Sequence, residues 1–415
     1  MAVYDVIVVG AGNAGLCAAL AARQADTRVL LLDKCPKAVR GGNTRFSGGG
    51  FRFTYSGLDD MRPMLPNLTD EEAARMEVGA YSTADFFDDV MQVTEYAADK
   101  KLTNILVDQS YATARWLTDM DVKWILSTST HAVKMGGKIK FPSGRVISIN
   151  DGGLGLVEML FPTAEKKGIE IIYEAKANGL IVDEKGRIAG VRAQTKEGPV
   201  EFNGRAVVLA AGGFEANPEM RARYLGQGWD LVKVRGSRYN SGEVLNLALG
   251  FGAQAVGHWS GCHAVLVDAE APDVECAYEH RYSYPYGIMV DINGKRFVDE
   301  GEDFFSYTYA KCGREVLRCR GARRTRFSTA RPGRCCARNT IAAFTFPPIA
   351  SKLWQKNYRV SIGKTSSRRS MPSTRPSTTR PSIPRSTTEN ARRALHRSSP
   401  TGPNAWTRRP IIRSR

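Results

Sequence analysis

The sequence has few of the residues that build metal centres or disulfide frameworks. Its 415 residues include five histidines and eight cysteines, and no two cysteines are spaced as Cys-x-x-Cys. This excludes a zinc ribbon and a thioredoxin-type site, so we expect no metal ion. A run of 18 apolar residues, which a membrane-spanning helix needs, is also missing. Because the amino terminus lacks the basic region of a signal peptide, we expect a cytoplasmic protein.

Acidic residues are almost absent from the end of the chain, where the positive charge is concentrated. Residues 321–415 hold 22 Lys and Arg and one acid, Glu389, whereas residues 1–320 hold 37 bases and 41 acids. A basic surface over the body is therefore excluded. After residue 360 the basic segment offers one aromatic residue, Trp406, so we expect no nucleic-acid partner.

The first 33 residues have the pattern of a β-α-β unit. Apolar, β-branched segments at 3–9 and 29–32 predict buried strands, and the Ala- and Leu-rich segment 14–25 predicts a helix between them. Their combined length is what such a unit requires. Further strands are predicted at 169–173, 179–183, 190–195 and 206–210, and helices at 69–100, 102–120 and 152–167. In the helix at 102–120 we expect Leu102, Ile105, Leu106 and Trp116 to face the core. The fold class is therefore α/β.

A Gly-x-Gly-x-x-Gly motif joins the first predicted strand to the helix. Gly10 permits the tight turn, Gly12 lets a pyrophosphate approach the backbone, and Gly15 lets helix and strand pack closely. The helix N-terminus supplies N–H groups and a positive dipole to the phosphate. Asp33 ends the second strand, where an acid can bond a ribose hydroxyl. The motif in this context predicts a bound dinucleotide.

A second glycine-rich segment indicates which dinucleotide. Five glycines lie within residues 41–50, which allows the backbone to press against a large flat ligand. A nicotinamide-dependent dehydrogenase usually continues with an ordinary helix here, so this segment favours FAD, with a nicotinamide enzyme as the alternative. A third glycine pair, Gly212 and Gly213, follows the predicted strand 206–210.

These three glycine segments resemble those of the fumarate reductase and succinate dehydrogenase flavoproteins. In that family the second segment lies along the isoalloxazine, and the late strand returns to the first β-α-β unit. The resemblance implies a Rossmann-like FAD domain of the glutathione-reductase type with an α+β capping domain. The FAD-binding residues that it implies are Gly10, Gly12, Asn13, Ala14, Gly15, Asp33, Lys34, Gly41, Gly42, Asn43, Thr44, Ser47, Gly48, Gly49, Ala211, Gly212 and Gly213.

Within this family, residues 233–242, 257–264 and 294–301 are similar to the tricarballylate dehydrogenase group. The resemblance covers about residues 3–317. It implies oxidation of a small polycarboxylate, tricarballylate to cis-aconitate, by hydride transfer to flavin N5. It also implies a membrane iron–sulfur or haem electron-transfer partner, through which the protein would be peripheral to the inner membrane. A precorrin-3B synthase-like flavoprotein and a fumarate reductase-like enzyme are alternatives.

Cationic side chains are the candidates for holding the substrate carboxylates, because an arginine fork binds a carboxylate bidentately. Arg235 and Arg238 lie in the segment that separates this group from plain fumarate reductases, and we expect them to bind substrate; the alternative is a surface salt bridge. His263 falls where the family carries a substrate-binding histidine, and the alternative is a structural role. His258 and His131 are weaker candidates.

Two departures from the family leave the catalytic base unassigned. Relatives carry a proton-transferring arginine shortly after an Arg-Phe-x-x-Glu stretch, and residues 301–306 contain no arginine. The family's Gly-Asp-Gly reads Gly242-Glu243-Val244 here, so a backbone with positive φ at Val244 would be strained.

The chain changes character after about residue 317. Residues 321–415 hold 10 of the 19 prolines and 19 arginines without periodicity, which predicts a disordered basic tail. We expect an FAD-binding domain over 1–257, the start of a capping domain over 258–317 and an aberrant tail over 318–415. A frameshift near residue 318 is our hypothesis for the tail, and a native nucleic-acid- or membrane-binding tail is the alternative. The chain as written should therefore be impaired in FAD binding and turnover, or a non-functional fragment.

Overall fold

The computed structural model describes residues 3–128, 132–268, 271–276, 284–291, 293–303, 305–319 and 326–329. By its contacts the chain divides into two units, Met1–Thr340 and Ile341–Arg415, and every described residue belongs to the first. The tail predicted over 318–415 therefore lies almost entirely outside the described residues, as does His131. Within it, strand β13 (Arg326–Thr329) pairs antiparallel with β12 (Gly287–Val290), so part of the predicted tail has regular structure.

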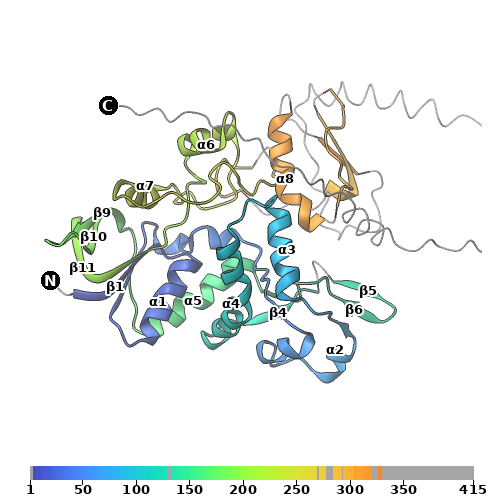
Figure 1. The fold of residues 1–415 in the computed structure, drawn as a ribbon, viewed down its shortest axis with the longest axis horizontal. Helices are drawn as coiled ribbons and strands as arrows, with labels where there is room; N and C mark the ends of the chain where they lie inside the picture. Colours follow the sequence, from blue (N-terminus) through green and yellow to red (C-terminus); the bar gives the residue numbers. More distant parts are fainter. Residues whose placement is uncertain are drawn as a thin grey trace, which may run out of the picture. The chain divides into compact units, whose positions relative to one another are not determined.

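The largest sheet among the described residues has six strands (Figure 1). In spatial order they are β8 (Glu170–Ile172), β2 (Val29–Leu32), β1 (Val3–Val9), β11 (Gly198–Leu209), β10 (Ile188–Thr195) and β9 (Lys176–Val182). The first four run parallel, whereas β10 and β9 continue the sheet antiparallel. β11 pairs with β1 from Val3↔Asn203 to Val9↔Leu209, so the expected return of the late strand is confirmed.

Alternate residues of β1 enter two cores, one on each face of the sheet. Val8 packs with Leu16 of α1 (Asn13–Gln24) and Leu160 of α5 (Gly152–Lys166), and all three are fully buried. Ile7 joins the opposite core, against which Leu247 of α7 (Glu243–Gly250) packs (Figure 1). Burial on both faces explains why these strands read as continuous apolar runs. The strands predicted at 3–9 and 29–32 and the helices predicted at 14–25 and 152–167 are confirmed.

The segment predicted as helical over 69–100 is interrupted. It contains α2 (Asp70–Ala74), β3 (Met76–Glu77) and α3 (Thr83–Val93). Thr69 starts α2 with a capping box, as its sequence predicts, and Ser82 starts α3 with a second one. The prediction of one continuous helix over 69–100 was therefore wrong, because Ser82 begins a new helix.

Helix α4 (Lys100–Asp119) presents a different face to the core than its largest apolar residues suggest. Leu102, Ile105 and Leu106, which the sequence predicts as core residues together with the partly buried Trp116, are more than half exposed. The buried positions are Thr103, Val107, Ser110, Ala114 and Leu117. These five residues form one stripe along the helix, whereas Leu102, Ile105 and Leu106 lie beside it. The neighbouring elements therefore pack against the stripe of smaller residues.

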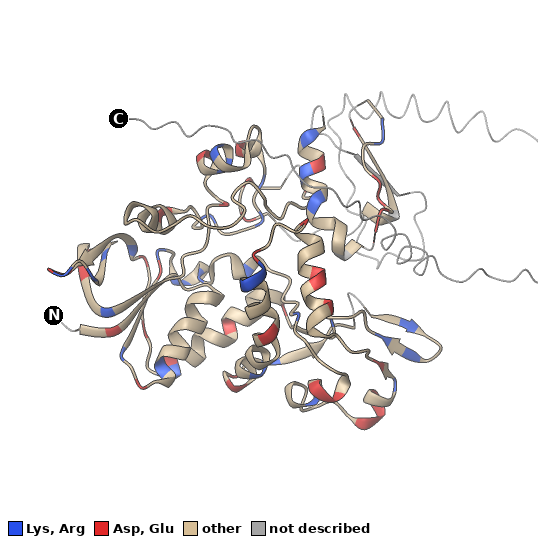
Figure 2. Cartoon of the chain, viewed as in Figure 1, with Lys and Arg blue, Asp and Glu red and all other residues tan. Residues whose placement is uncertain are grey.

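The remaining strands and helices lie outside the six-stranded sheet. β4 (Trp124–Leu126) pairs with β7 (Ile147–Ile149), and β5 (Val133–Met135) and β6 (Lys138–Lys140) form a sheet with β3. Asn217 caps α6 (Pro218–Leu225), and α8 is Phe305–Arg318. Over the described part of the chain no helix has the length and apolarity to cross a bilayer. Figure 2 shows basic and acidic residues interspersed over these elements.

Candidate functional site

The first glycine motif makes the turn between β1 and α1. Gly10 has a φ of +103°, and a Cβ there would lie 2.7 Å from Ala211 Cα at the end of the late strand. A Cβ on Gly15 would lie 1.7 Å from the carbonyl oxygen of Gly10. Helix and strand therefore meet backbone to backbone, which is the close packing that the motif predicts.

Asp33 fixes this turn from the end of β2. One carboxylate oxygen accepts the Ala11 N–H at 2.9 Å, and the other accepts the Cys35 N–H at 3.1 Å. The side chain is buried, yet it lines the cavity described below. Each carboxylate oxygen can accept a further hydrogen bond, so Asp33 can hold the turn and bond a ribose hydroxyl at the same time.

The second glycine segment lies between the first turn and α5. The Asn13 N–H donates to Thr44 Oγ1 at 2.9 Å, which joins the two glycine segments. The Gly153 N–H donates to the Ser47 carbonyl at 3.0 Å, and a Cβ on Gly153 would lie 1.7 Å from the Thr44 carbonyl oxygen. This contact at the start of α5 fixes the path of the segment.

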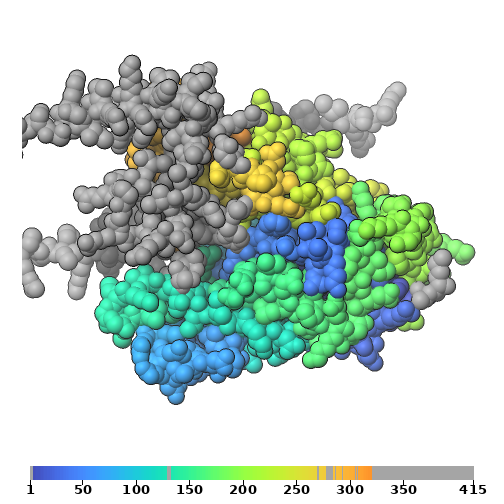
Figure 3. Space-filling model, turned by 180° about the vertical axis from the view of Figure 1, so that it is seen from behind, coloured from blue at the N-terminus to red at the C-terminus, as the bar shows by residue number. Residues whose placement is uncertain are grey.

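Residues far later in the chain close the other side of this segment. The Ser237 N–H donates to Asn43 Oδ1 at 2.9 Å, and the Arg235 guanidinium donates to the Phe46 carbonyl. Figure 3 shows the early part of the chain, in blue, beside parts coloured green and yellow that come much later. The second glycine segment is thus enclosed by α1, α5 and the segment after α6.

A first cavity, of about 170 Å³, lies along the glycine turns. The predicted cofactor residues that line it are Gly10, Gly12, Asn13, Ala14, Asp33, Lys34, Gly42, Asn43, Thr44, Ala211 and Gly212. Lining residues that the sequence did not reveal include Ala175, Lys176, Ala177, Tyr239, Asn240 and Glu243. The first three lie at the start of β9 and the last three at or just before the start of α7, so only the folded chain brings them to this edge.

Lys34 and Glu243 form an ion pair in the wall of this cavity. Lys34 Nζ lies 2.7 Å from Glu243 Oε2 and 2.7 Å from Ser241 Oγ, and Lys176 Nζ lies 3.4 Å from Glu243 Oε1. Burial raises the pKa of Glu243, but hydrogen bonds from Lys34, backbone and Ser241 and the Lys34 charge outweigh it and lower this pKa to about 2. Glu243 is therefore ionised at neutral pH.

The departure from the family's Gly-Asp-Gly at residues 242–244 introduces no backbone strain. Gly242 takes the positive φ, +81°, and α7 begins at Glu243, so Val244 lies in the first helical turn. The strain expected if Val244 needed a positive φ does not arise.

A second cavity, of about 420 Å³, adjoins the first and shares Asn13 and Thr44 with it. Its other described lining residues are Ser47, Gly48, Gly49, Gly50, Phe51, Arg145, Leu156, Arg235, His263 and Tyr309. The structure thus brings together two predicted substrate residues, Arg235 and His263, next to the predicted flavin segment. Arg145 and Tyr309 were missed, because no local motif marks them.

His263 is held at this cavity by α8. Its ring meets the Tyr309 ring edge to face, with centroids 5.1 Å apart and an interplanar angle of 73°. The next residue, Ala264, donates its N–H to the Ala310 carbonyl at 2.8 Å and accepts the Gly313 N–H at 3.1 Å. The chain before α8 therefore runs along the helix, which sets the position of the imidazole.

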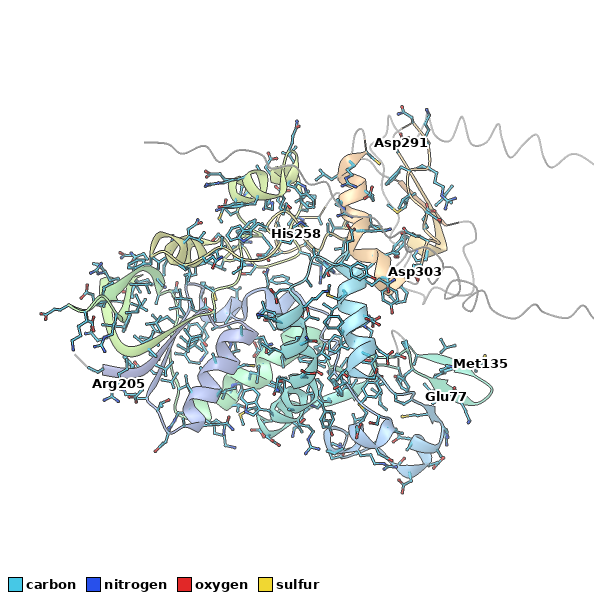
Figure 4. The ribbon with its side chains drawn as sticks, viewed as in Figure 1. Glu77, Met135, Arg205, His258, Asp291 and Asp303 are labelled. Atoms are coloured by element: carbon cyan, nitrogen blue, oxygen red, sulfur yellow. The ribbon has the colours of Figure 1, made fainter. Side chains whose placement is uncertain are left out.

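Several predicted residues line neither cavity. Arg238 is 58% exposed and pairs with Glu275 at 2.9 Å, so its role in binding a carboxylate stays a prediction that its position does not support. Gly15, Gly41 and Gly213 also lie outside both linings, as does the exposed His258 (Figure 4). Within the described residues, no three His, Cys, Asp or Glu side chains group as metal ligands.

A glycine turn held by an acid, with a second glycine-rich segment beside it, defines a dinucleotide-binding α/β protein of the flavoprotein class. The family model FAD_binding_2, described as an FAD binding domain, matches residues 5–324. The chain belongs to this family, and FAD is its cofactor.

Two solved structures share the fold. The open conformation of a flavocytochrome c3 fumarate reductase has a TM-score of 0.58 and 24% identity, over 77% of this chain and 51% of that one. The 3-ketosteroid-Δ4-(5α)-dehydrogenase from Rhodococcus jostii RHA1 has a TM-score of 0.56 and 23% identity, over 76% and 64%. Both support the α/β FAD-binding architecture.

The curated relatives include several reductases. Urocanate reductase of Eggerthella lenta is 31% identical over 224 residues, which are 53% of this chain and 33% of the relative. Vinyl phenol reductase of Lactiplantibacillus plantarum is 29% identical over 315 residues, 74% and 58%. Fumarate reductase (cytochrome) of Shewanella frigidimarina is 28% identical over 220 residues, 53% and 35%. The matches thus span between about a third and three fifths of these relatives.

Proposed function

We propose that this protein is an FAD-dependent oxidoreductase acting on a carbon–carbon bond of a carboxylate substrate. The observation that carries the proposal is the second cavity, which adjoins the FAD segment and is lined by Arg145, Arg235 and His263. No Asp or Glu is among its described lining residues. A cationic cavity of this kind suits an anionic substrate. The chemistry that FAD supplies when bound is hydride transfer at N5 of its flavin.

The chain's own residues bind and orient the substrate. The Arg235 backbone lies in the segment whose Ser237 N–H bonds Asn43, and its guanidinium also bonds the Phe46 carbonyl. A fixed guanidinium fork can bind a carboxylate bidentately and stabilise charge that develops beside it. Phe51 and Leu156 supply apolar walls that exclude water.

The finer proposal is a polycarboxylate substrate, with tricarballylate oxidised to cis-aconitate. This reaction removes a hydride from one carbon and a proton from its neighbour, and the electrons then pass to an iron–sulfur or haem partner. Two arginines and a histidine in one cavity support a substrate with several carboxylates. The cytochrome in the name of one relative supports the partner. A cytoplasmic protein that meets this partner at the inner membrane fits the proposal.

The reverse direction is the second candidate, reduction of an unsaturated acid. The names of urocanate reductase, vinyl phenol reductase and fumarate reductase favour it, because each describes a reductase. The same cavity would hold the unsaturated acid, and the chain's residues would have the same roles.

Turnover by the purified 415-residue chain, reconstituted with FAD, tests both directions. Oxidation of tricarballylate with an electron-accepting dye is compared with reduction of cis-aconitate, fumarate and urocanate by a reduced viologen. A yellow protein that turns over tricarballylate supports the finer proposal, and we expect the rate to be low. Turnover of none of these acids would overturn the proposed function, and a colourless protein that uses NAD would favour the nicotinamide alternative.

A further inference from the structure

We propose that Arg145 is a specificity-determining residue that binds a second substrate carboxylate, in addition to the one that Arg235 holds. This inference rests on the proposed function, since it concerns the substrate of the same cavity. Neither the sequence pattern nor the family resemblance indicated Arg145. It reaches the cavity from the loop that precedes β7, whereas Arg235 follows α6 and His263 precedes α8.

The backbone beneath Arg145 is held firmly. The Gly144 N–H donates to Tyr55 Oη at 2.8 Å, and the Arg145 N–H closes a turn onto the Pro142 carbonyl at 3.2 Å. Gly144 has a φ of +75°, and a Cβ there would lie 2.8 Å from the Tyr81 ring. A side chain on a rigid backbone loses less entropy when it binds a ligand.

Both neighbours of this turn are anchored as well. Phe141 and Val146 are 4% and 1% exposed, so they fix the loop at its two ends. The Val146 carbonyl accepts the Ser127 N–H at 2.8 Å, immediately before the β4–β7 pair. The Arg145 side chain is only half-buried and lines the cavity. The loop therefore presents one cationic side chain from a fixed platform.

The charge of the cavity selects for more than one carboxylate. Two guanidinium groups and an imidazole line it, and none of the described lining residues is an acid. Each guanidinium fork that lines the cavity can bond a carboxylate bidentately. A site built to bond two carboxylates should discriminate against an acid that has one, because one fork then loses its ligand. The substrate class is thus a di- or tricarboxylate, with Arg145 reading the additional group.

Calorimetric titration of the FAD-reconstituted full chain tests this without depending on turnover. The ligands are butyrate, succinate and tricarballylate, which carry one, two and three carboxylates. Arg145→Gln should weaken succinate and tricarballylate binding about ten- to a hundredfold, the loss expected for a hydrogen-bonded charged group. Butyrate binding should change less than about threefold. Arg145→Lys keeps the charge without the fork and should fall between the two.

Controls separate this inference from the proposed function. Arg192→Gln removes an exposed arginine on β10 that pairs with Glu201 on β11. It should leave the affinities for all three acids unchanged. If Arg145→Gln binds all three acids like the unmodified protein, while Arg235→Gln removes the difference in affinity between them, the inference is overturned and the proposed function stands. Equal weakening of all three acids by Arg145→Gln also overturns it. If the unmodified protein does not prefer tricarballylate over butyrate, the polycarboxylate proposal fails together with the inference.

Discussion

The Tyr307 hydroxyl on α8 donates a 2.8 Å hydrogen bond to Oδ1 of Asp89 on α3. Oδ2 of the same carboxylate accepts the Tyr81 hydroxyl at 2.6 Å and pairs with Arg52. One carboxylate therefore connects α8, which carries Tyr309, with residues that follow the second glycine segment. Burial and then Asp89 raise the pKa of Tyr307 to about 12, so this phenol is protonated and donates at neutral pH.

Tyr307→Phe should loosen α8 while leaving the nucleotide cavity intact. It removes one hydrogen bond across the α3–α8 contact, which contributes about 1 kcal/mol. Hydrogen exchange should show faster exchange of the α8 amides and little change in α1. Tyr96→Phe is the control, since Tyr96 is 76% exposed. Unchanged α8 exchange would show that the Asp89 contact does not hold the helix.

Gly15→Ala should prevent the turn from closing. Its Cβ would lie 1.7 Å from the Gly10 carbonyl oxygen, so backbone must move, at a cost of about 3 kcal/mol or more. We expect a lower urea midpoint and loss of FAD, measured by absorbance at the flavin band. Gly79→Ala is the matched control, because a Cβ there meets nothing within 4 Å. Normal FAD content in the Gly15 variant would contradict the packing role.

Asp33→Asn should weaken both the fold and FAD binding. The carboxylate accepts two backbone N–H groups, and an amide can accept only one without turning a donor toward the other. We expect a loss of about 1–3 kcal/mol in stability and at least tenfold weaker FAD binding. FAD titration by fluorescence quenching measures the affinity.

Asp183→Asn provides the comparison for this substitution. Asp183 accepts two backbone N–H groups at Oδ1, from Lys185 and Arg187, and its Oδ2, which the substitution replaces, pairs with the Arg187 guanidinium in the exposed β9–β10 turn. It should lower stability while leaving FAD affinity unchanged. An equal loss of FAD affinity in both variants would indicate a general loss of stability and not a role of Asp33 at the site.

Glu243→Gln should make stability less dependent on acid pH. Folding lowers the pKa of Glu243 from 4.5 to about 2, so the Lys34 contact stabilises the protein fully above pH 4.5 and is lost as pH falls toward 2. At pH 7 the variant should be about 1 kcal/mol less stable, because the pair is partly exposed. Urea unfolding at successive pH values should show this difference shrink below pH 4.5. A constant difference would exclude the ion pair as its cause.

Local chain geometry explains what could be predicted. The turn at Gly10, the strands 3–9 and 29–32 and the position of Asp33 depend on residues close in sequence, and the structure places them as expected. The interior of α4 was predicted wrongly, because its apolar residues occupy more than one face and only the neighbouring helices decide which one is buried. Leu102 is 66% exposed, while Val107 is buried.

The sequence by itself determined the dinucleotide-binding class of this protein, because a strand, a glycine turn, a helix and an acid follow one another along the chain, and the glycine-rich segment 41–50 favoured FAD as the dinucleotide. Only the tertiary structure decided which side chains share the second cavity. Arg145, Arg235 and His263 come from three separate segments. The backbone beside them is fixed by hydrogen bonds from the Gly144, Ser237 and Ala264 N–H groups to Tyr55, Asn43 and Ala310. Their proximity depends on packing between distant segments, for which no spacing in the sequence is a signal.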